Sequence, residues 1–594
     1  MTPREEYELR LEDRKLRLAQ RQRIEKAISI SRLAVMSVLV AVAWFSLQSG
    51  LFSPTWMAIP AAVFGGLVLA HRRILSSARR AERSATFYED GLARLDDRWA
   101  GRGKNGSAYQ DQDHLYTPDL DIFGDGSLFE LLATTRTRAG DDCLASWLRG
   151  PADRATVERR QAMVKELRER LDFRERLSSV GADVAEGVDG EALIEWAQAT
   201  PDRQPPWLRG LLALLAAGQM LGVAGWAAFG WGPTLLLALL LVHSILTLAL
   251  RQRIRRSTEG ASGAGRDLAL LGKVLSLIEA EDFTDDGLRA LQQELKVDAV
   301  SPAQRIDSLR TLVNLADSTK NPIFVPIAIL LVWTPQVALA MDGWRSSTGH
   351  RVSRWLAVAG EVEALAALAS FAYENPEDVF PEIVDGATPV LDGEELGHPL
   401  LPRRRCVRND IRLDAHRRAL MISGSNMSGK STYLRTVGVN TILALAGAPV
   451  RARRLRLSSL RIGASIQIND SLQDGQSRFY REILRVRDIL RLAEDRQPTL
   501  FLLDEILHGT NSHDRRIGAD AVLRSLLKRQ AIGLVTTHDL ALAQLCDDPD
   551  VAAVNVHFED EIIEGKMVFD YKLRTGVVEK SNAIELMREV GLEV

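Results

Sequence analysis

The sequence predicts a C-terminal α/β domain built on a parallel sheet, preceded by an all-α region and by two transmembrane helical hairpins. From about residue 385 onward, short apolar runs alternate with segments of helical periodicity, which is the pattern of a parallel α/β sheet. Upstream, two long runs contain no Asp, Glu, Lys or Arg: residues 33–70, a run of 38, and residues 210–250, a run of 41.

The composition is that of a globular chain with three or four domains. The 594 residues are 46% hydrophobic and 26% charged, and 75 basic against 78 acidic side chains give a net charge of −3. These values exclude collagen-like, low-complexity and wholly disordered chains. Any contact with nucleic acid therefore has to come from a local basic patch. The three cysteines lie far apart without a CxxC pair, which argues against a disulfide framework or a zinc site.

Each uncharged run has the length of two short membrane-spanning helices joined by a tight turn. One span needs about 20 apolar residues, and turn-forming residues occur within each run, at 48–54 and 230–233. Basic residues flank the runs, with nine Lys or Arg in 1–32, five Arg in 71–83 and four Arg in 251–256. Under the positive-inside rule this predicts four spans in the cell inner membrane, with both termini and the C-terminal domain in the cytoplasm. The alternative is a buried core hairpin.

A third apolar stretch, 322–341, contains three prolines and lacks comparable basic flanks. We expect it to form a buried core helix or a pair of helices rather than a fifth span. The expected organisation is a charged cytoplasmic N-terminal helix (1–32), transmembrane hairpin 1 (33–70), a basic flank and linker (71–118), a helical region (119–209), transmembrane hairpin 2 (210–250), a helical core or lever region (251–384) and the α/β domain (385–594).

The strongest motif is Gly-Ser-Asn-Met-Ser-Gly-Lys-Ser-Thr at 424–432, which matches GxxxxGK[ST] in full. It follows an apolar strand, 419–422, and precedes a segment that can continue as a helix, which is the context of a phosphate-binding loop. In such a loop backbone N–H groups surround the phosphates, the lysine binds the β- and γ-phosphates and the next hydroxyl ligates Mg²⁺. The alternative is a chance match in a glycine-rich turn. The predicted nucleotide-binding residues are Gly424, Ser425, Asn426, Met427, Ser428, Gly429, Lys430, Ser431 and Thr432, with Ser431 also a Mg²⁺ ligand.

Two carboxylates, Asp504 and Glu505, end a second apolar strand that begins at residue 499. In P-loop ATPases the first acid holds Mg²⁺ and the second polarises the attacking water as general base; the alternative is an acidic pair that caps a helix. A third strand, 531–537, ends in His538, where a histidine can sense the γ-phosphate or orient water. The sequence therefore predicts a P-loop NTPase that uses ATP and Mg²⁺, with Lys430, Glu505 and His538 as catalytic residues.

Together these motifs resemble the MutS family of DNA mismatch-repair ATPases. The resemblance covers roughly residues 390–594 and extends more weakly to 119–175. The segments that carry it are His398-Pro399, 424–432, 461–465, Gly475-Gln-Ser477-Arg-Phe-Tyr-Arg-Glu482, 504–506, 509–510 and Thr537-His538.

The resemblance implies an ABC/MutS-type domain in an obligate dimer with composite ATP sites. In such a dimer Ser477 would reach the γ-phosphate bound by the partner, and ATP would switch a clamp on DNA. Several features depart from the family pattern. Ser425 and Ser428 stand where the family typically has Pro and Gly, and His508 replaces the usual Arg. Nothing near the N-terminus resembles the mismatch-reading domain, and the second uncharged run occupies the place of the curtailed lever and clamp helices.

The sequence thus predicts a membrane-anchored homodimeric ATPase whose hydrolysis drives a conformational switch, with mismatched or branched DNA as a partner implied by the family. The alternative is an ATP-dependent membrane signalling or assembly module that does not bind DNA. A transporter is less favoured, because transport sites usually need polar groups within the membrane. The uncharged runs offer few, such as Gln219 and His243. Two basic clusters, 403–405 and 451–461, are candidate contacts for DNA phosphates or anionic lipid, or simply solvated surface.

Overall fold

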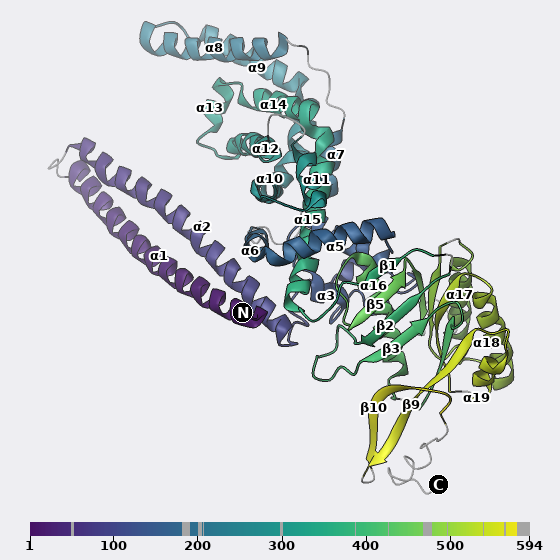
Figure 1. The fold of residues 1–594 in the computed structure, drawn as a ribbon. Coiled ribbons are helices and arrows are strands. Elements are labelled where there is room, and N and C mark those ends of the chain that lie inside the picture. Colours follow the sequence, from purple (N-terminus) through teal and green to yellow (C-terminus); the bar gives the residue numbers. More distant parts are fainter. Residues whose placement is uncertain are drawn as a thin grey trace. The chain divides into compact units, whose positions relative to one another are not determined.

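The computed structural model describes residues 1–48, 53–180, 190–199, 205, 207–296, 301–386, 388–425, 427–466, 478–495, 497–538, 540–563 and 566–578. The chain divides into two compact units (Figure 1). Unit 1 comprises 1–134, 144–179 and 365–594, and unit 2 comprises 135–143 and 180–364. Helices α4 (Arg138–Arg149) and α15 (Val352–Glu374) run through the division.

A six-stranded sheet forms the centre of the C-terminal part of unit 1. Its order is β10-β9-β4-β8-β7-β6, and all neighbours are parallel except β10 and β9. The strands predicted at 419–422, 499–503 and 531–537 are confirmed as β4, β7 and β8. The bounds are β4 (Ala419–Ser423), β6 (Arg461–Ser465), β7 (Thr499–Leu503), β8 (Ala531–Thr536), β9 (Ala553–Ile563) and β10 (Lys566–Thr575).

Helices cover both faces of this sheet, so β4, β7 and β8 are buried along their whole length. Alternate side chains such as Met421 and Phe501 pack with α17 (Arg478–Leu492) and α18 (Ser512–Leu527) in one core. The other face meets α16 (Lys430–Ala446), where a side chain at Gly438 would collide with Leu502. Strands that are buried on both faces have continuous apolar sequences, which explains why the sequence located them correctly.

A second sheet of four strands, which the sequence did not indicate, completes the C-terminal part of unit 1. Its order is β1-β5-β2-β3, with β1 parallel to β5 and the other pairs antiparallel. Its strands are short and half-exposed and show no long apolar run. The bounds are β1 (Glu382–Val384), β2 (Leu391–Leu396), β3 (Asn409–Leu413) and β5 (Arg454–Ser458); short helices α19 (Leu540–Ala543) and η5 (Gln544–Asp547) precede β9.

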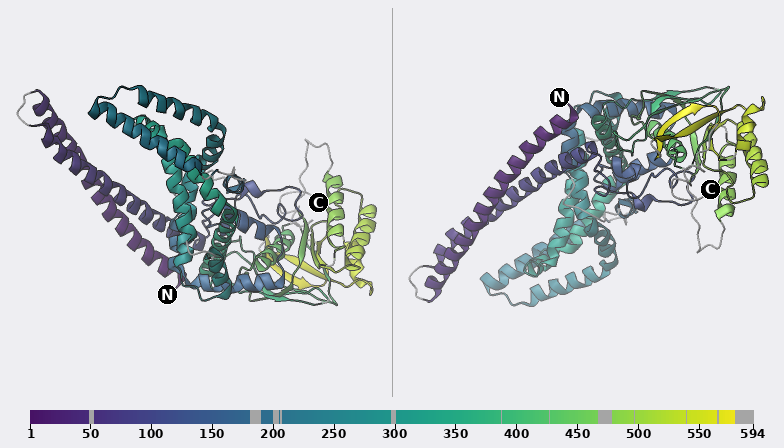
Figure 2. Two further views of the ribbon diagram at one scale, coloured as in Figure 1. Left: turned by 90° about the horizontal axis from the view of Figure 1, so that it is seen from above. Right: turned by 90° about the horizontal axis from the view of Figure 1, so that it is seen from below.

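The N-terminus of unit 1 is a long helical hairpin, and Figures 1 and 2 show its two helices running side by side. Helix α1 (Pro3–Gln48) is continuous, so the charged helix expected at 1–32 and the first half of hairpin 1 are one element. Helix α2 (Ala58–Leu95) follows η1 (Pro54–Met57) and continues well beyond residue 70, where a flank and linker were expected. The extension is held by packing, because Tyr7, Phe87, Tyr88 and Leu171 form one buried cluster.

The remaining helices of unit 1 follow hairpin 1 in the chain, and all of them except η2 lie in the region expected to be helical, 119–209. The bounds are η2 (Ser107–Tyr109), α3 (Leu128–Leu132), α5 (Arg154–Glu169) and α6 (Leu171–Ser179).

Unit 2 is all helical over its described residues, and its segment after residue 250 lies in the helical core or lever region expected at 251–384. Hairpin 2 consists of α8 (Trp207–Phe229) and α9 (Thr234–Ala249), joined at the turn expected at 230–233. Leu208, Leu212 and Leu215 pack with Val332 and Leu339. The other elements are α7 (Gly190–Gln198), α10 (Arg251–Ala280), α11 (Asp286–Leu295), α12 (Pro302–Asp317), η3 (Ser318–Lys320), α13 (Val325–Leu330), α14 (Trp333–Thr348) and η4 (Gly349–Arg351).

The third apolar stretch forms a pair of helices, but only one of them is buried as expected. Val337, Leu339 and Met341 of α14 lie in the interior, whereas α13 exposes Ile327 and Ile329 by 48% and 44%. The reason is the break at Val332, whose left-handed backbone (φ +49°) ends α13 and turns the chain into α14.

Four helices are long and apolar enough to cross a membrane, judged by length and composition within the described residues. The segments are Pro3–Ser46, Thr55–Leu95, Trp207–Phe229 and Trp333–Glu374, and a fifth arises if Thr234–Ala249 and Arg251–Thr258, bent by 63°, count as one span. Hairpin 1 buries none of its most apolar residues within the structure, whereas the corresponding window in Trp333–Glu374 is 83% buried.

Candidate functional site

The glycine-rich loop joins the carboxyl end of β4 to the first turn of α16. Gly424 and Gly429 take left-handed backbone angles (φ +148° and +101°), and a side chain at Gly424 would lie 2.9 Å from the Phe558 carbonyl oxygen. Met427 also has positive φ (+71°), a strained conformation for a residue with a side chain. Asn426 lies outside the described residues. The motif therefore builds a tight loop that only glycines permit at its two ends.

Lys430 is the first residue of α16, and its side chain curls back over the loop. Its Nζ donates to the carbonyl oxygens of Gly424 and Ser425 at 2.9 and 2.8 Å. Burial lowers the pKa of Lys430, and the carboxylates of Glu505, Asp504 and Asp560 oppose that shift. The ammonium is only 5% exposed and is held by neutral carbonyl groups, so its charge is available to an anion in the loop.

Two hydroxyl groups of the loop have no hydrogen-bond partner within the described residues. They are the Oγ atoms of Ser425 and Ser428, and Ser428 is 99% buried. Buried hydroxyls without partners are uncommon in folded proteins. The loop therefore holds donors that a phosphate group can satisfy, which fits a bound nucleotide.

The two carboxylates lie directly after β7, beside the carboxyl end of β8. The Glu505 N–H donates to Thr536 Oγ at 2.9 Å, and the Thr536 hydroxyl donates in turn to Asp504. Glu505 and Leu507 both have positive φ (+48° and +58°). This strained turn points both acids toward the loop, and strain of this kind gathers at functional sites.

His538 connects the glycine-rich loop to the second carboxylate. Its Nδ1 lies 3.1 Å from the Gly424 carbonyl oxygen, and its Nε2 hydrogen-bonds Glu505. That hydrogen bond lowers the pKa of Glu505, although partial burial acts in the opposite direction. Glu505 is therefore ionised at neutral pH, as a general base has to be.

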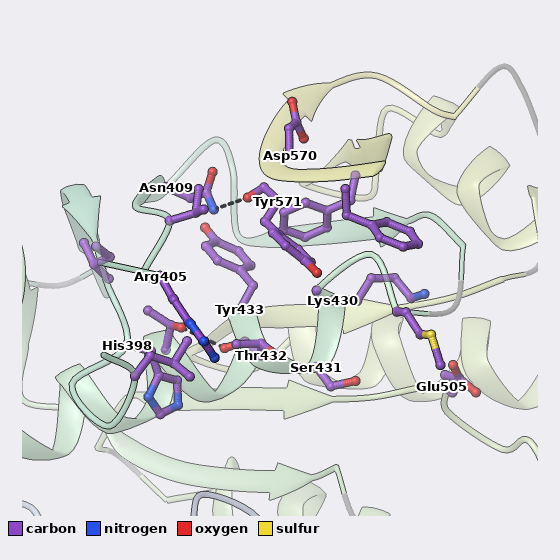
Figure 3. Close-up of a pocket in the computed structure, with 18 residues that line it drawn as sticks. His398, Arg405, Asn409, Lys430, Ser431, Thr432, Tyr433, Glu505, Asp570 and Tyr571 are labelled. Atoms are coloured by element: carbon purple, nitrogen blue, oxygen red, sulfur yellow. Dashed lines mark hydrogen bonds between the residues drawn. The ribbon is translucent and has the colours of Figure 1, made fainter. Parts of the chain in front are cut away.

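A cavity of about 760 Å³ opens beside the loop (Figure 3). Lys430, Ser431 and Glu505 line it at the loop, and the Tyr571 ring of β10 lies against the same loop, where a side chain on Gly429 would come within 3.0 Å of it. His398 lines the other end. The complete lining is Leu396, His398, Leu401, Arg405, Val407, Asn409, Met427, Gly429, Lys430, Ser431, Thr432, Tyr433, Thr436, Glu505, Phe558, Phe569, Asp570 and Tyr571.

The wall of this cavity that contains Tyr571 and Tyr433 is held by contacts between segments distant in sequence. Asn409 of β3 donates through Nδ2 to the Tyr571 carbonyl oxygen at 2.9 Å, and the Tyr433 hydroxyl donates to the Asp410 carbonyl oxygen at 2.8 Å. Burial lowers the pKa of His398 to about 4, so its ring is neutral. Sequence reasoning missed this wall, apart from noting His398-Pro399, because no local motif marks Asn409 or Tyr571.

The structure brings together nearly all the predicted site residues that it describes. The loop, Lys430, Ser431, Asp504, Glu505 and His538 converge at the carboxyl edge of the sheet, as Figure 3 shows for Lys430, Ser431 and Glu505. Ser477 lies outside the described residues. In α17, whose first residue is Arg478, Glu482 accepts a hydrogen bond from the Leu507 N–H.

The basic clusters considered as contacts for DNA phosphates or anionic lipid, or as solvated surface, are largely engaged within unit 1. Arg451 is buried and donates to the carbonyl oxygens of His398 and Leu401 at 3.2 and 3.0 Å. Four further arginines pair with carboxylates, as Arg453 and Arg454 with Glu394, Arg456 with Glu382 and Arg461 with Asp495. Arg403 pairs with Glu377 and hydrogen-bonds Asn375.

The part of the chain that contains this geometry is similar to known proteins. Residues 420–593 match the model of MutS domain V. A "DNA mismatch repair protein MutS" of Brevibacillus brevis is 34% identical over 303 residues, which are 48% of this chain and 34% of that protein. "DNA mismatch repair protein MutS 2" of Halobacterium salinarum is 34% identical over 263 residues, 42% of this chain and 29% of the relative.

A longer alignment joins the chain to a "DNA mismatch repair protein MutS" of Bacillus licheniformis. It is 29% identical over 510 residues, which are 78% of this chain and 56% of that protein. The chain therefore spans between about a third and about a half of the length of these relatives. The glycine-rich loop, the carboxylate pair and the strand-end histidine all fall within the stretch that matches MutS domain V.

Proposed function

We propose that this protein is a membrane-anchored ATPase that binds and hydrolyses ATP in a composite site of a homodimer and uses the cycle to switch its conformation. The observation that carries the proposal is the glycine-rich loop. Its buried Lys430 donates to backbone carbonyls, and two of its serine hydroxyls have no partner within the described residues. The strained acidic turn of Asp504 and Glu505 closes the same edge of the sheet. Phosphates need cations and N–H donors, and an attacking water needs a base; both are present here.

Each residue at this edge has a role in that chemistry. Lys430 and the backbone of the loop would bind the β- and γ-phosphates, and Ser431 and Asp504 would hold Mg²⁺, which would neutralise phosphate charge. Glu505 takes a proton from the attacking water. His538 keeps Glu505 ionised and, through its contact with Gly424, keeps the base aligned with the loop.

The cavity supplies room for the rest of the nucleotide. It continues from Lys430 to the aromatic ring of Tyr571, and its volume lies in the range usual for small-molecule sites. The Tyr571 ring and a neutral His398 both line the cavity, and they suit a flat, uncharged base better than a second phosphate.

The dimer and the membrane anchor complete the proposal. Family resemblance assigns Ser477 to the γ-phosphate of the partner's nucleotide. Hairpins 1 and 2 would anchor the chain in the cell inner membrane with the ATPase domain in the cytoplasm, because their uncharged runs have basic flanks.

DNA, mismatched or branched, is the partner that the relatives' names suggest. One observation favours the second candidate, a signalling or assembly module that works without DNA. The arginines at 451–461 are held by carboxylates and carbonyls of unit 1, so they offer fewer free charges to a DNA backbone than their sequence suggested.

Steady-state ATPase activity of the full chain in nanodiscs tests both candidates, with Glu505→Gln as the control. We expect Mg²⁺-dependent turnover in the wild type and a loss of about a thousandfold in Glu505→Gln with ATP binding retained. Each protein is assayed without DNA and with homoduplex, mismatched and branched duplexes. Stimulation by one DNA form assigns the partner, and activity indifferent to all forms supports the signalling module. Equal turnover by wild type and Glu505→Gln contradicts the ATPase proposal.

A further inference from the structure

Charged side chains are unevenly distributed along the whole helical hairpin of α1 and α2, which divides into three zones. The base, residues 1–17 of α1 and 84–95 of α2, carries six basic and seven acidic side chains. The next zone, which we name the cationic stalk, comprises 18–32 and 71–83 and carries nine basic but only two acidic side chains. The tip, 33–48 and 53–70 of the described residues, carries no charge.

In the base, every cation has a carboxylate partner. Arg14 binds Glu175 of α6 at 2.7 Å, and Arg94 binds Glu374 of α15 through two bonds of 2.7 Å. The remaining pairs are Arg4 with Asp96, Arg10 with Glu6 and Asp172, Lys15 with Glu89, and Arg17 with Asp13. The charges of the base are therefore used within unit 1.

The stalk differs. Within the part of the chain that the structure describes, seven of its cations have no carboxylate oxygen within 4.0 Å. They are Arg21, Arg23, Lys26, Arg32, Arg72, Arg73 and Arg80. Arg79 and Arg83 have other interactions. An array of unneutralised cations on a protruding hairpin needs counterions, and a fixed polyanion supplies them best.

The position of the cations points to which polyanion this is. They end where the apolar surface begins, with Arg32 on α1 and Arg72 on α2. At this boundary the Arg32 guanidinium lies 5.6 Å above the Phe64 ring, and its buried Nε has no partner within the described residues. The apolar tip of α1, residues 33–48, is about 24 Å long at ~1.5 Å per residue. That is shorter than the ~30 Å hydrocarbon core, so insertion of the tip draws the boundary arginines into the phosphate layer.

We propose that the cationic stalk binds anionic phospholipid headgroups, so that the protein selects negatively charged lipid around hairpin 1; the inference rests on the membrane anchoring proposed above. Arg32, Arg72 and Arg73 meet the headgroups next to the apolar tip. Arg21, Arg23 and Arg80 lie up to about 18 Å further along the helices at ~1.5 Å per residue, and they reach the surface when the hairpin tilts. The attraction between the stalk and the headgroups is electrostatic, so it weakens as the salt concentration is raised.

The test uses the full chain with Arg72→Gln, Arg73→Gln and Arg80→Gln combined. Glutamine keeps a good helix former at exposed positions, so the hairpin should fold, and circular dichroism checks this. The matched control removes three charges elsewhere in unit 1, at the exposed Arg98 and Lys528 and the half-buried Arg168: Arg98→Gln, Arg168→Gln and Lys528→Gln. Each protein is extracted from bilayers of phosphatidylcholine mixed with phosphatidylglycerol, and native mass spectrometry counts the two lipids it retains.

We expect the wild type and the control to retain phosphatidylglycerol in excess of its bulk fraction. The stalk variant should lose that enrichment by about tenfold or more, because each Lys or Arg near an anionic surface contributes roughly a fivefold factor. An embedded wild type without lipid preference, or a stalk variant that keeps the preference, overturns the stalk assignment and leaves the anchor intact. A wild-type chain that remains in the soluble fraction overturns the anchor itself.

Nucleic acid is the competing polyanion, and a mobility-shift assay with duplex DNA distinguishes it. The stalk variant should bind DNA as the wild type does. Loss of DNA binding together with unchanged lipid enrichment would assign the stalk to DNA and contradict the proposal.

Discussion

The carboxyl edge of the six-stranded sheet and the base of hairpin 1 both bury charged side chains, but they neutralise them in different ways. At the base, the carboxylate of Glu374 is 2% exposed and receives two bonds from Arg94 and one from the Tyr7 hydroxyl. At the sheet edge, Lys430 is 5% exposed, and within the described part of the chain its ammonium hydrogen-bonds only backbone carbonyls, beside serine hydroxyls that have no partner there. A buried charge that is fully paired holds the fold together, whereas one that meets only neutral dipoles is available for a ligand.

The largest effect should come from Lys430→Ala. The substitution removes the cation that would bind the phosphates, so we expect ATPase kcat/KM to fall by at least about a hundredfold. The thermal midpoint should not fall, because no carboxylate loses its partner. Nucleotide titration and steady-state turnover measure the loss, with exposed Lys528→Ala as the control. Unchanged turnover in Lys430→Ala would remove the distinction between the two regions.

Glu374→Gln should produce the opposite pattern. Arg94 would stay buried without a compensating charge, and breaking a buried pair from one side costs about 3–5 kcal/mol. We expect a clear drop in the free energy of unfolding, while turnover per folded molecule is kept at low temperature. Arg453→Gln breaks an exposed pair with Glu394 and should cost less than about 1 kcal/mol. Equal destabilisation by both variants would show that pairing at the base has no special weight.

The smallest effect is a shift in pH dependence on replacing His538. The hydrogen bond from His538 lowers the pKa of Glu505, so the base stays ionised and active to lower pH than an ordinary glutamate. His538→Gln should raise that pKa toward its usual value and move the acid limb of the pH–rate profile upward. His508, 3.8 Å from Glu505, contributes less, so His508→Gln should shift the limb less. An acid limb that stays in place in His538→Gln contradicts the assigned contact.

How well the sequence anticipated the structure depended on how local each signal was. The glycine-rich loop, the strands before it and before Asp504, and His538 were placed correctly, because a strand buried on both faces and a phosphate-loop motif are short, contiguous patterns. The four-stranded sheet was missed, since its strands pair residues far apart, as Asp392 with Arg456. The pairing of Arg453 with Glu394 could not be predicted for the same reason, so more cations of the cluster were expected to lack a carboxylate partner than is the case.

The cavity wall that contains Tyr571 shows most clearly what could not be predicted from the sequence. Tyr571 reaches the loop because β10 folds back along β9, and Asn409 then fixes it from the other sheet. Neither residue lies in a motif, and their separation of 162 positions leaves no periodic trace. The break at Val332 was equally hidden, because an uncharged stretch with prolines does not reveal which of its two helices faces outward.

Helix α1 also has a mechanical consequence. It runs unbroken over 46 residues, with Pro3 as its only proline and no glycine, so it has none of the usual sites for a kink. At ~1.5 Å per residue this makes a stiff rod of about 69 Å, and a tilt of roughly ten degrees at one end moves the other by about 12 Å. Small rotations at the contacts with Glu175 and Glu374 are therefore magnified into large excursions of the tip. If the tip is held in place, the helix in turn restricts rotation at the contacts with Glu175 and Glu374.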